Sequence, residues 1–413
     1  RRRNSGGYGS RCLRRVFGIV DSFFRESGSV STKPGQLHAR DRRAGVGAAP
    51  GTRPNSSRLD RTSRASAARK LRGGAERGAN GPASSFTDRR KSAMVAAVLP
   101  APPTRKPRDA VEYRFSGHET FPCRYAWLPK AFSEIQQAPD ALADDEQAMI
   151  ELGVGKNMVR AIRFWLGATG LARGKRDGTF EATPFGRDLM AADPYLEDIR
   201  TLWLIHWQIA SHVQQPIFAW DLLLNAWTRS EFTRSGVLEE FQRASKLHGK
   251  RLSAVTLEQH FDVFLHSYVP TRGKKGEVQE DNLDCPLVEL DLIRKVGERT
   301  SAAGKAEALY AFRYDEKPEI TPALFVCLLD DYWTRRAPNE QTLDMRDVLL
   351  GPGSPGQLLK LSESDLRERL LRIEGDSAGR FSFRESVARQ QVSRAETAKH
   401  PSVATVYEVR ARA

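Results

Sequence analysis

The stretch DDEQAMIELGVGKNMVRAIRFWLGATGLARGKRDGTFEATPFGRDLM, residues 144–190, decides the fold. Its apolar pattern predicts a short helix that ends at a Gly-Val-Gly turn and a second helix over residues 156–168. The apolar residues of the second helix recur at about 100° per residue and therefore share one side. Its basic residues, Lys156, Arg160 and Arg163, fall within the opposite arc. We expect one face of this helix to pack and the other to stay basic.

Two short extended segments follow this helix and flank a tight turn. The turn has the sequence KRDG at residues 175–178, and Asp-Gly suits a hairpin. Thr183 and Pro184 then supply the N-cap and the first residue of another helix. Helix, turn, basic-faced helix and basic-tipped hairpin are the order of a winged helix-turn-helix.

This winged helix-turn-helix can be interpreted either as a DNA-binding module or as a module whose charged face has no role in DNA binding. In the functional interpretation, basic side chains contact DNA phosphates and Asn157 reads a base edge. The residues assigned to phosphates are Lys156, Arg160, Arg163, Lys175 and Arg176. In the alternative, the charged face is only solvated, and the module is structural or binds a protein.

The segment VEYRFSGHETFPCRYAWLPKAFSEI, residues 111–135, lies upstream of this region. It opens with a strand-like alternation, breaks at Ser116-Gly117 and continues as a helix after Pro122. His118 and Glu119 are therefore expected in a turn, where side chains are presented rather than buried. Such a pair can act as a general base and a metal-orienting carboxylate. The alternative is a turn held by a hydrogen bond from backbone to side chain.

A further helix is predicted over residues 199–213, where the sequence is apolar on nearly every side. Such a pattern indicates a central buried helix. We interpret His206 and His212, within or beside it, as hydrogen-bonded structural residues.

Residues 216–300 are predicted to continue as helices and to contain an acidic loop. Glu280, Asp281 and Asp284 follow a Gly/Lys-rich segment, and Asp262 precedes it. Hydrolysis of a phosphodiester with magnesium or manganese needs oxygen ligands that hold the metal. We therefore predict that Asp262, Asp281 and Asp284 bind a divalent metal. The alternative is a loop whose charge only favours solubility.

The pattern along the chain predicts a mainly α protein with small β elements, of the α+β class. A winged helix-turn-helix is followed by a helical core and a smaller C-terminal α/β unit. The predicted ranges are a basic leader at 1–110, the winged-helix region at 111–215, the helical region at 216–300, an α/β or second winged-helix unit at 301–395, and a tail at 396–413.

Charge is divided unevenly along the 413 residues, whose formal net charge is +14. The first 100 residues hold 22 Lys and Arg against six Asp and Glu, a balance of +16, so the remaining 313 residues carry −2. Any DNA contact in the body must therefore come from local patches. Residues 1–93 contain no methionine and have the composition of a disordered leader, so we expect Met94 to be the natural start.

Composition and missing motifs exclude several classes of protein. No apolar run is long enough for a membrane span, and the four cysteines form no C-x-x-C pair, so a cytoplasmic protein with reduced thiols is expected. The chain has no phosphate-binding loop, no G-x-G-x-x-G after a strand and no G-x-S-x-G elbow. ATPase, Rossmann oxidoreductase and α/β-hydrolase assignments all lose support.

Several short motifs together resemble a bacterial family of unknown function. They are SGHETF at residues 116–121, followed by Arg124 and Trp127-Leu128, then GVGKNMV at residues 153–159, DNLDCPL at residues 281–287, and SPG at residues 354–356. The family is encoded beside sulfur-transfer genes for DNA phosphorothioation, and the resemblance covers roughly residues 113–389. It implies a component of a phosphorothioation-based defence system, in whose single-strand version the corresponding subunit nicks DNA.

Two hypotheses follow from the residues and the resemblance together. The first is a DNA-binding component of such a system that acts as a metal-dependent nickase, with His118 and Glu119 in the catalytic site. Its partners are DNA and the sulfur-transfer and ATPase subunits of the system. The second is a noncatalytic winged-helix adaptor or transcriptional regulator, or a scaffold that recruits the sulfur-transfer enzymes.

Overall fold

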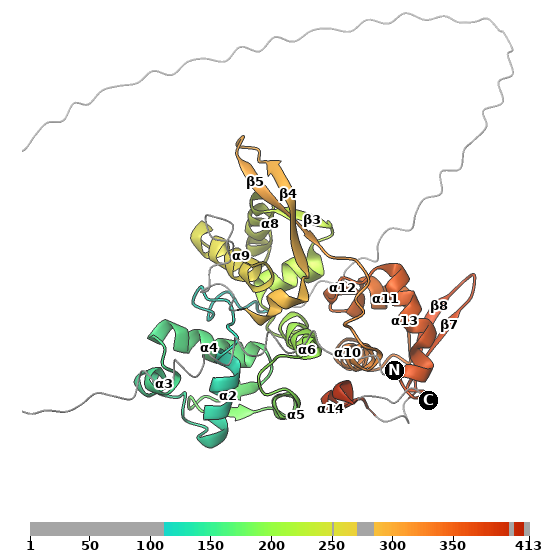
Figure 1. Ribbon diagram of the computed structural model, residues 1–413. Coiled ribbons are helices and arrows are strands. Elements are labelled where there is room, and N and C mark those ends of the chain that lie inside the picture. Colours follow the sequence, from blue (N-terminus) through green and yellow to red (C-terminus); the bar gives the residue numbers. More distant parts are fainter. Residues whose placement is uncertain (1–110, 250–251, 271–284, 396–399, 409–413) are drawn as a thin grey trace, which may run out of the picture. The chain divides into compact units, whose positions relative to one another are not determined.

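The computed structural model describes residues 111–249, 252–270, 285–395 and 400–408. Helices dominate these residues, and three small antiparallel sheets accompany them (Figure 1). The predicted mixed α+β class is therefore confirmed. The expected leader at residues 1–110 lies outside the described residues.

The N-terminal helical group contains the stretch that decides the fold. Its elements are α2 (Trp127–Gln137), α3 (Asp145–Leu152), α4 (Lys156–Ala168), β1 (Ala172–Gly174), β2 (Phe180–Ala182) and α5 (Pro184–Ala192). Asp144 caps α3 by accepting two backbone N–H bonds, and Gly153 ends it at φ +66°. Thr183 caps α5 by accepting from the N–H of Gly186, as predicted. The order of helices and hairpin matches the expectation, and its assignment to the winged-helix class stays a prediction.

The central helix is α6 (Ile199–Ala210), and it packs against elements from two other regions, η3 (Pro286–Leu290) and α10 (Pro322–Arg336). Its side chains are buried on nearly all sides, which confirms the predicted central position. A helix buried all round cannot present a site to solvent, so its role is to hold neighbouring elements in place.

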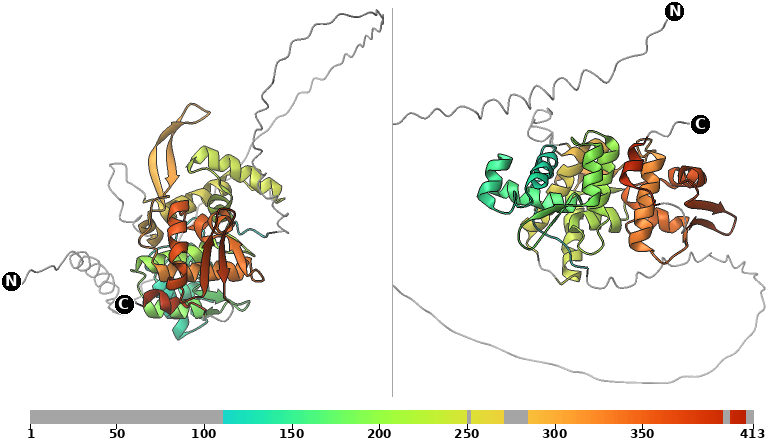
Figure 2. Two further views of the ribbon diagram at one scale, coloured as in Figure 1. Left: turned by 90° about the vertical axis from the view of Figure 1, so that its right-hand side faces the viewer. Right: turned by 90° about the horizontal axis from the view of Figure 1, so that it is seen from below.

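The middle region combines helices with a three-stranded sheet. Its other elements are α7 (Phe218–Trp220), η1 (Asp221–Ala226), β3 (Glu231–Thr233), α8 (Arg234–Leu247), α9 (Ala254–Tyr268), β4 (Ile293–Thr300) and β5 (Ala306–Phe312). The strands pair antiparallel in the order β3-β5-β4. The β4–β5 hairpin extends beyond the helices in Figure 1 and in the left-hand view of Figure 2. The sequence pattern predicted only helices between residues 216 and 300, so β3 and β4 are additions to that expectation.

The C-terminal region repeats this mixture of helices and a small sheet. Besides α10, its elements are β6 (Thr342–Asp344), α11 (Met345–Leu350), α12 (Pro355–Leu358), α13 (Glu363–Asp376), β7 (Phe381–Glu385), β8 (Gln390–Arg394) and α14 (Val403–Tyr407). The strand order is β6-β8-β7, again antiparallel. In the described part of the chain, no helix is apolar and long enough to cross a membrane. The described cysteines, Cys123, Cys285 and Cys327, are free thiols.

A buried hydrogen-bond network centred on Tyr268 ties four helical elements together. His206 of α6 lies 3.0 Å from the carbonyl oxygen of Leu358, which only accepts, so Nε2 carries the proton and Nδ1 is an acceptor. The hydroxyl of Tyr268 on α9 therefore donates to Nδ1 of His206 at 2.8 Å. It accepts in turn from the indole N–H of Trp220 at 2.9 Å. All these groups are buried, so each bond satisfies an atom that water does not reach.

Removal of the Tyr268 hydroxyl should destabilise the protein. In Tyr268→Phe, the Trp220 N–H and the His206 Nδ1 both lose their partner while buried, which should lower the free energy of unfolding by about 2–4 kcal/mol. Urea unfolding followed by tryptophan fluorescence measures this change. Tyr195→Phe is the matched control, because Tyr195 is 66% exposed, and it should change stability by less than about 0.5 kcal/mol. Equal stabilities of the two variants would contradict the role of the network.

Candidate functional site

The segment that contains His118 and Glu119 is held beside the start of α7. The N–H of Arg114 donates to the carbonyl of Pro216 at 3.0 Å, and the N–H of Phe218 donates to the carbonyl of Arg114 at 3.2 Å. A short parallel bridge pairs Arg114 with Ile217. These contacts fix the strand-like residues, and the chain then turns sharply before α2, as the sequence predicted.

The turn has an unusual backbone, with positive φ at three of four consecutive residues. Gly117 has φ +112°, Glu119 +48° and Thr120 +70°. The left-handed region is unfavourable for residues with a Cβ, and residues held there cluster at functional sites. At Gly117 a Cβ would also lie 2.6 Å from the ring of Phe164, so this position requires glycine on two grounds.

His118 points inward from this turn and is 4% exposed, so the expectation that the turn presents its side chains is wrong for this residue. The backbone N–H of Thr120 donates to its Nδ1 at 3.3 Å, so Nδ1 is an acceptor and Nε2 carries the proton. Nε2 then donates to Nδ1 of His260 at 3.1 Å, and Nε2 of His260 donates to the carbonyl of Phe115. The two imidazoles thus form a chain of donors in which both rings are neutral.

Burial keeps this histidine pair neutral. Burial above all, together with the neighbouring His260 and Arg114, lowers the pKa of His118 to about 3. Burial also lowers the pKa of His260 below its ordinary value. The Thr120 bond is the backbone contact that the structural alternative for His118 expects. Its catalytic role stays a prediction.

Glu119 differs from His118 in that its carboxylate has no hydrogen-bond or ion-pair partner within the described ranges. The side chain is partly exposed, and no hydrogen bond or ion pair engages it among the residues that the structure describes. A carboxylate on a constrained backbone and without a partner is free to bind a cation or accept a proton. Glu119 is therefore the acidic group that this turn presents.

Arg114 supplies a positive charge next to the turn. Its guanidinium lies 4.3 Å from the centre of the Phe164 ring, and burial lowers its pKa. No carboxylate within the described ranges pairs with it. Sequence reasoning missed Arg114, because one arginine in an alternating strand carries no distinctive signal. Its charge suits an anionic ligand at this place.

The acidic residues predicted to bind metal do not meet at His118 within the described residues. Asp262 pairs with Arg234, whose second nitrogen lies 3.0 Å from Oδ2. Asp262 and His260 are two positions apart on α9 and so point about 200° apart. Asp281 and Asp284 lie outside the described residues. In the described ranges no three His, Cys, Asp or Glu side chains form a metal-binding group.

Cys285 shows where the acidic loop rejoins the described chain. The thiol of Cys285 lies near enough to Cys123 to raise the pKa of that thiol, which burial already raises. Cys123 is five residues beyond His118, and Cys285 directly follows Asp284. Cys285, the first described residue after the acidic loop, therefore lies close to the segment that follows the turn.

The predicted DNA-binding residues of α4 separate into two kinds. Arg163 is committed to the start of α3 and the turn before it, since it pairs with Asp145 at 2.5 Å and donates to the carbonyl of Leu142 at 2.6 Å. Lys156 and Arg160 share the same carboxylate at 3.2 and 4.0 Å and are about half exposed. These contacts lower the pKa of Asp145, and the hydrogen bond from Arg163 has the largest effect. Lys156, Asn157 and Arg160 thus lie on an open face, whereas Arg163 fastens two helices together.

The β1–β2 hairpin carries the other two predicted residues. Lys175 pairs with Glu181 at 3.2 Å across the hairpin, and Arg176 is exposed. Asp177 closes the turn by accepting from Thr179, which lowers the pKa of this carboxyl. The tip is therefore ordered by its own side chains and leaves Arg176 available.

Comparison with known proteins gives one family and two solved structures. Residues 115–408 match a family described as "Protein of unknown function (DUF4007)". The structure titled "Magnesium ion-bound SspB crystal structure" is similar, with 26% identity, a TM-score of 0.59 and coverage of 69% of this chain and 85% of the other. A second, titled "SspB crystal structure", has 27% identity and the same TM-score and coverage. No curated protein matches the sequence.

The buried histidine pair predicts how stability depends on pH. Folding lowers the pKa of His118 from 6.5 to about 3, so the unfolded chain binds more protons between these pH values. The free energy of unfolding should be highest above pH 6.5 and should fall as the pH drops, by at most about 1.4 kcal/mol per pH unit for each such histidine. Urea unfolding at pH 7.5, 6.5 and 5.5 measures this slope.

Substitution isolates the contribution of His118 to this slope. His118→Asn should reduce it, because one titrating group is removed. His248→Asn, at an exposed position, is the matched control. An unchanged slope in His118→Asn would exclude a neutral buried imidazole at this position.

Proposed function

Because the chain belongs to the DUF4007 family and is similar to SspB, we propose that it is a DNA-binding component of a bacterial phosphorothioation-based defence system and that it nicks DNA with a divalent metal. The likeness to SspB supports the link to phosphorothioation. The nicking activity is supported by one observation above all: within the described residues, neither the carboxylate of Glu119 on its constrained turn nor the nearby guanidinium of Arg114 has an ion-pair partner.

The donor set at the turn fits magnesium or manganese. Magnesium keeps several waters and is commonly held by one or two carboxylates together with substrate phosphates, so a site need not contain three protein ligands. We assign Glu119 as one ligand and Asp281 or Asp284 as another. The anchoring of Cys285 near Cys123 supports this assignment. A bound metal would neutralise charge on the scissile phosphodiester. Asp262 is not assigned as a metal ligand, because it pairs with Arg234.

The other groups at the turn have distinct roles in this proposal. Arg114 binds a non-bridging phosphate oxygen, since its charge is not balanced by a carboxylate of the described chain. His118 is a positioning residue, because a pKa of about 3 makes it a poor base near neutral pH. Its bond to the Thr120 N–H holds the backbone that presents Glu119.

DNA is bound in this proposal by the N-terminal helical group, acting as a winged helix-turn-helix. Lys156, Arg160, Lys175 and Arg176 contact phosphates, and Asn157 faces base edges. Arg163 contributes by fixing α4 on α3. The sulfur-transfer and ATPase subunits of the system are the proposed protein partners.

A noncatalytic adaptor or regulator is the second candidate. It is favoured by the burial of His118 and by its bond to Thr120, which a purely structural turn also needs. In this case the winged helix binds DNA or a protein, and Glu119 has no metal. The two candidates differ in metal-dependent strand cleavage, which the first requires and the second lacks.

Relaxation of supercoiled plasmid by the full chain tests the nickase. With magnesium or manganese, we expect open-circular product, and Glu119→Gln should reduce the rate at least about 100-fold because the carboxylate is lost as a ligand. Glu112→Gln is the matched control, since Glu112 is exposed two residues before Arg114. Each protein is assayed alone and with the partner subunits. Nicking that persists in Glu119→Gln would refute the assigned site, and its absence from the native chain in both assays would favour the adaptor.

Separate substitutions on α4 test the DNA-binding face. Arg160→Ala should weaken binding of a duplex severalfold without changing stability, because one phosphate contact is removed. Arg163→Ala should instead lower the free energy of unfolding by about 1–3 kcal/mol, since its buried partner Leu142 loses a donor. Gel shift and urea unfolding of both variants measure the two effects. If Arg160→Ala binds as tightly as the native chain, this face does not contact DNA.

A further inference from the structure

The C-terminal region and the middle region share a general order of elements: a helix, a short strand, further helices and a closing hairpin. In the middle region, helix α7 is followed by β3, α8, α9 and the β4–β5 hairpin. In the C-terminal region, α10 is followed by β6, α11, α12, α13 and the β7–β8 hairpin. In both sheets the last strand lies between the other two. This is the order of a winged helix, in which the last hairpin is the wing.

The helix before the C-terminal wing is a poor fit for a DNA groove. The exposed face of α13 carries Glu363, Glu368 and Glu374, which phosphates repel. Its Arg367 is occupied by Glu385, at 2.6 Å. The exposed face of α13 is therefore excluded as a DNA-binding surface, and any DNA contact in this region must lie elsewhere.

The β7–β8 wing, in contrast to the acidic face of α13, carries exposed basic residues. Arg384 and Arg389 lie on or beside its strands, and Arg346 lies near it at the start of α11. No carboxylate within the described part of the chain forms an ion pair with any of the three. Val387 at the tip is fully exposed, so the hairpin end is uncovered. Figure 1 and the right-hand view of Figure 2 show this hairpin extending from α13.

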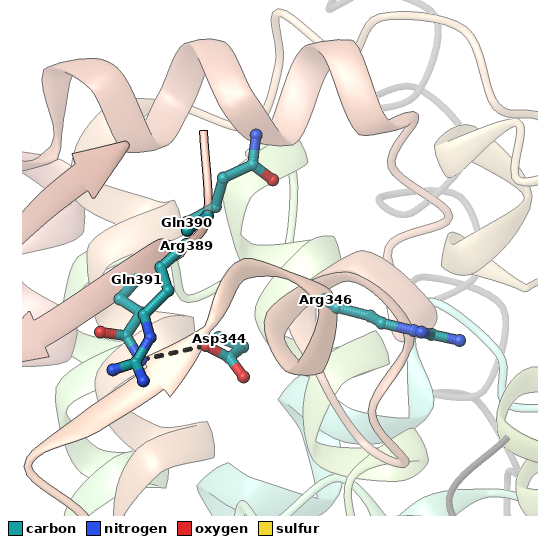
Figure 3. Close-up of a pocket in the computed structure, with 6 residues that line it drawn as sticks. Asp344, Arg346, Arg389, Gln390 and Gln391 are labelled. Carbon is teal, nitrogen blue, oxygen red and sulfur yellow. Dashed lines mark hydrogen bonds between the residues drawn. The ribbon is translucent and has the colours of Figure 1, made fainter. Parts of the chain in front are cut away.

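A hollow of about 530 Å³ separates the wing from the start of α11. Its lining residues are Asp344, Arg346, Ala388, Arg389, Gln390 and Gln391. Figure 3 shows Asp344 between Arg346 on one side and the wing residues on the other. Gln391 donates to Asp344 at 3.2 Å. Because the two arginines do not converge, the hollow does not fit one small anion, and it suits separate charges spaced along a polymer.

We propose that the β7–β8 wing and the start of α11 form a second DNA-contact surface, which binds the phosphodiester backbone of a duplex through Arg346 and Arg389. The inference rests on the proposed DNA-binding function and adds a site far along the chain from α4. The side-chain amides of Gln390 and Gln391 already donate to Glu385 at 2.6 Å and to Asp344 at 3.2 Å, so the two arginines carry the proposed contact. Contacts of this kind position the protein on DNA and carry no sequence preference.

Asp344 in the hollow gives the proposal a second, opposite prediction. Asp344 repels a phosphate that approaches Arg346 or Arg389, so its charge weakens the contact without preventing it. Asparagine at this position keeps an oxygen that accepts from Gln391 and removes the charge. Asp344→Asn should therefore bind DNA more tightly, whereas loss of the arginines should weaken binding.

The experiment measures binding of the full chain to a fluorescent 30-base-pair duplex by anisotropy, over a series of salt concentrations. The double variant Arg346→Gln/Arg389→Gln should bind about tenfold more weakly, and its salt dependence should fall by about 1–2 units of log Kd per log salt, since two phosphate contacts are lost. Asp344→Asn should bind about two- to threefold more tightly. Arg372→Gln, on the exposed face of α13, is the matched control and should bind like the native chain.

The outcomes separate this inference from the proposed function. If Arg160→Ala weakens binding and the double variant changes neither affinity nor salt dependence, the wing does not contact DNA and only this inference fails. If Arg372→Gln weakens binding as much as the double variant, the contact lies on α13 and the inference is again wrong. If the native chain binds no duplex at any salt concentration, both proposals fail. Circular dichroism of each variant excludes unfolding as the cause.

Discussion

The hydroxyl of Tyr268 is the interaction on which the arrangement of this protein depends. It joins α9 to the central helix α6 through His206 and to α7 through Trp220, and His206 extends the link to α12. The same helix, α9, carries His260 to the turn at residues 117–120. The helix that brings His260 to the candidate site is thus held in place by a buried network whose central hydroxyl has two hydrogen-bond partners.

Local patterns made much of the fold predictable from the sequence. Asp144, Gly153 and Thr183 act within a few residues of the helix ends that they define, so their roles follow from the sequence alone. The central helix was equally predictable, because a helix that is apolar on all sides is stable only in the interior of a globular protein. The sheet of the middle region was missed because β3 has three residues and pairs with a strand more than 70 residues later.

The candidate site was predictable in its position and not in its chemistry. The break at residues 116–117 correctly indicated a turn, but the partner of His118 is 142 residues away, and no local pattern records it. Similarly, the arc of basic residues on α4 was identified, while the commitment of Arg163 to the carbonyl of Leu142 was not. The sequence shows which charged residues share a helix face, but it does not show which of them already form hydrogen bonds or ion pairs with a neighbouring segment.

The close approach of Gly117 to Phe164 has a consequence for comparing relatives. These positions lie 47 residues apart, yet a side chain at the first would occupy the space of the ring at the second. A homologue with alanine or a larger residue at the first position would need both a smaller residue at the second and a different backbone path. The glycine–phenylalanine pair therefore serves as a two-position diagnostic for sorting homologous sequences into those that keep this turn and those that have diverged from it.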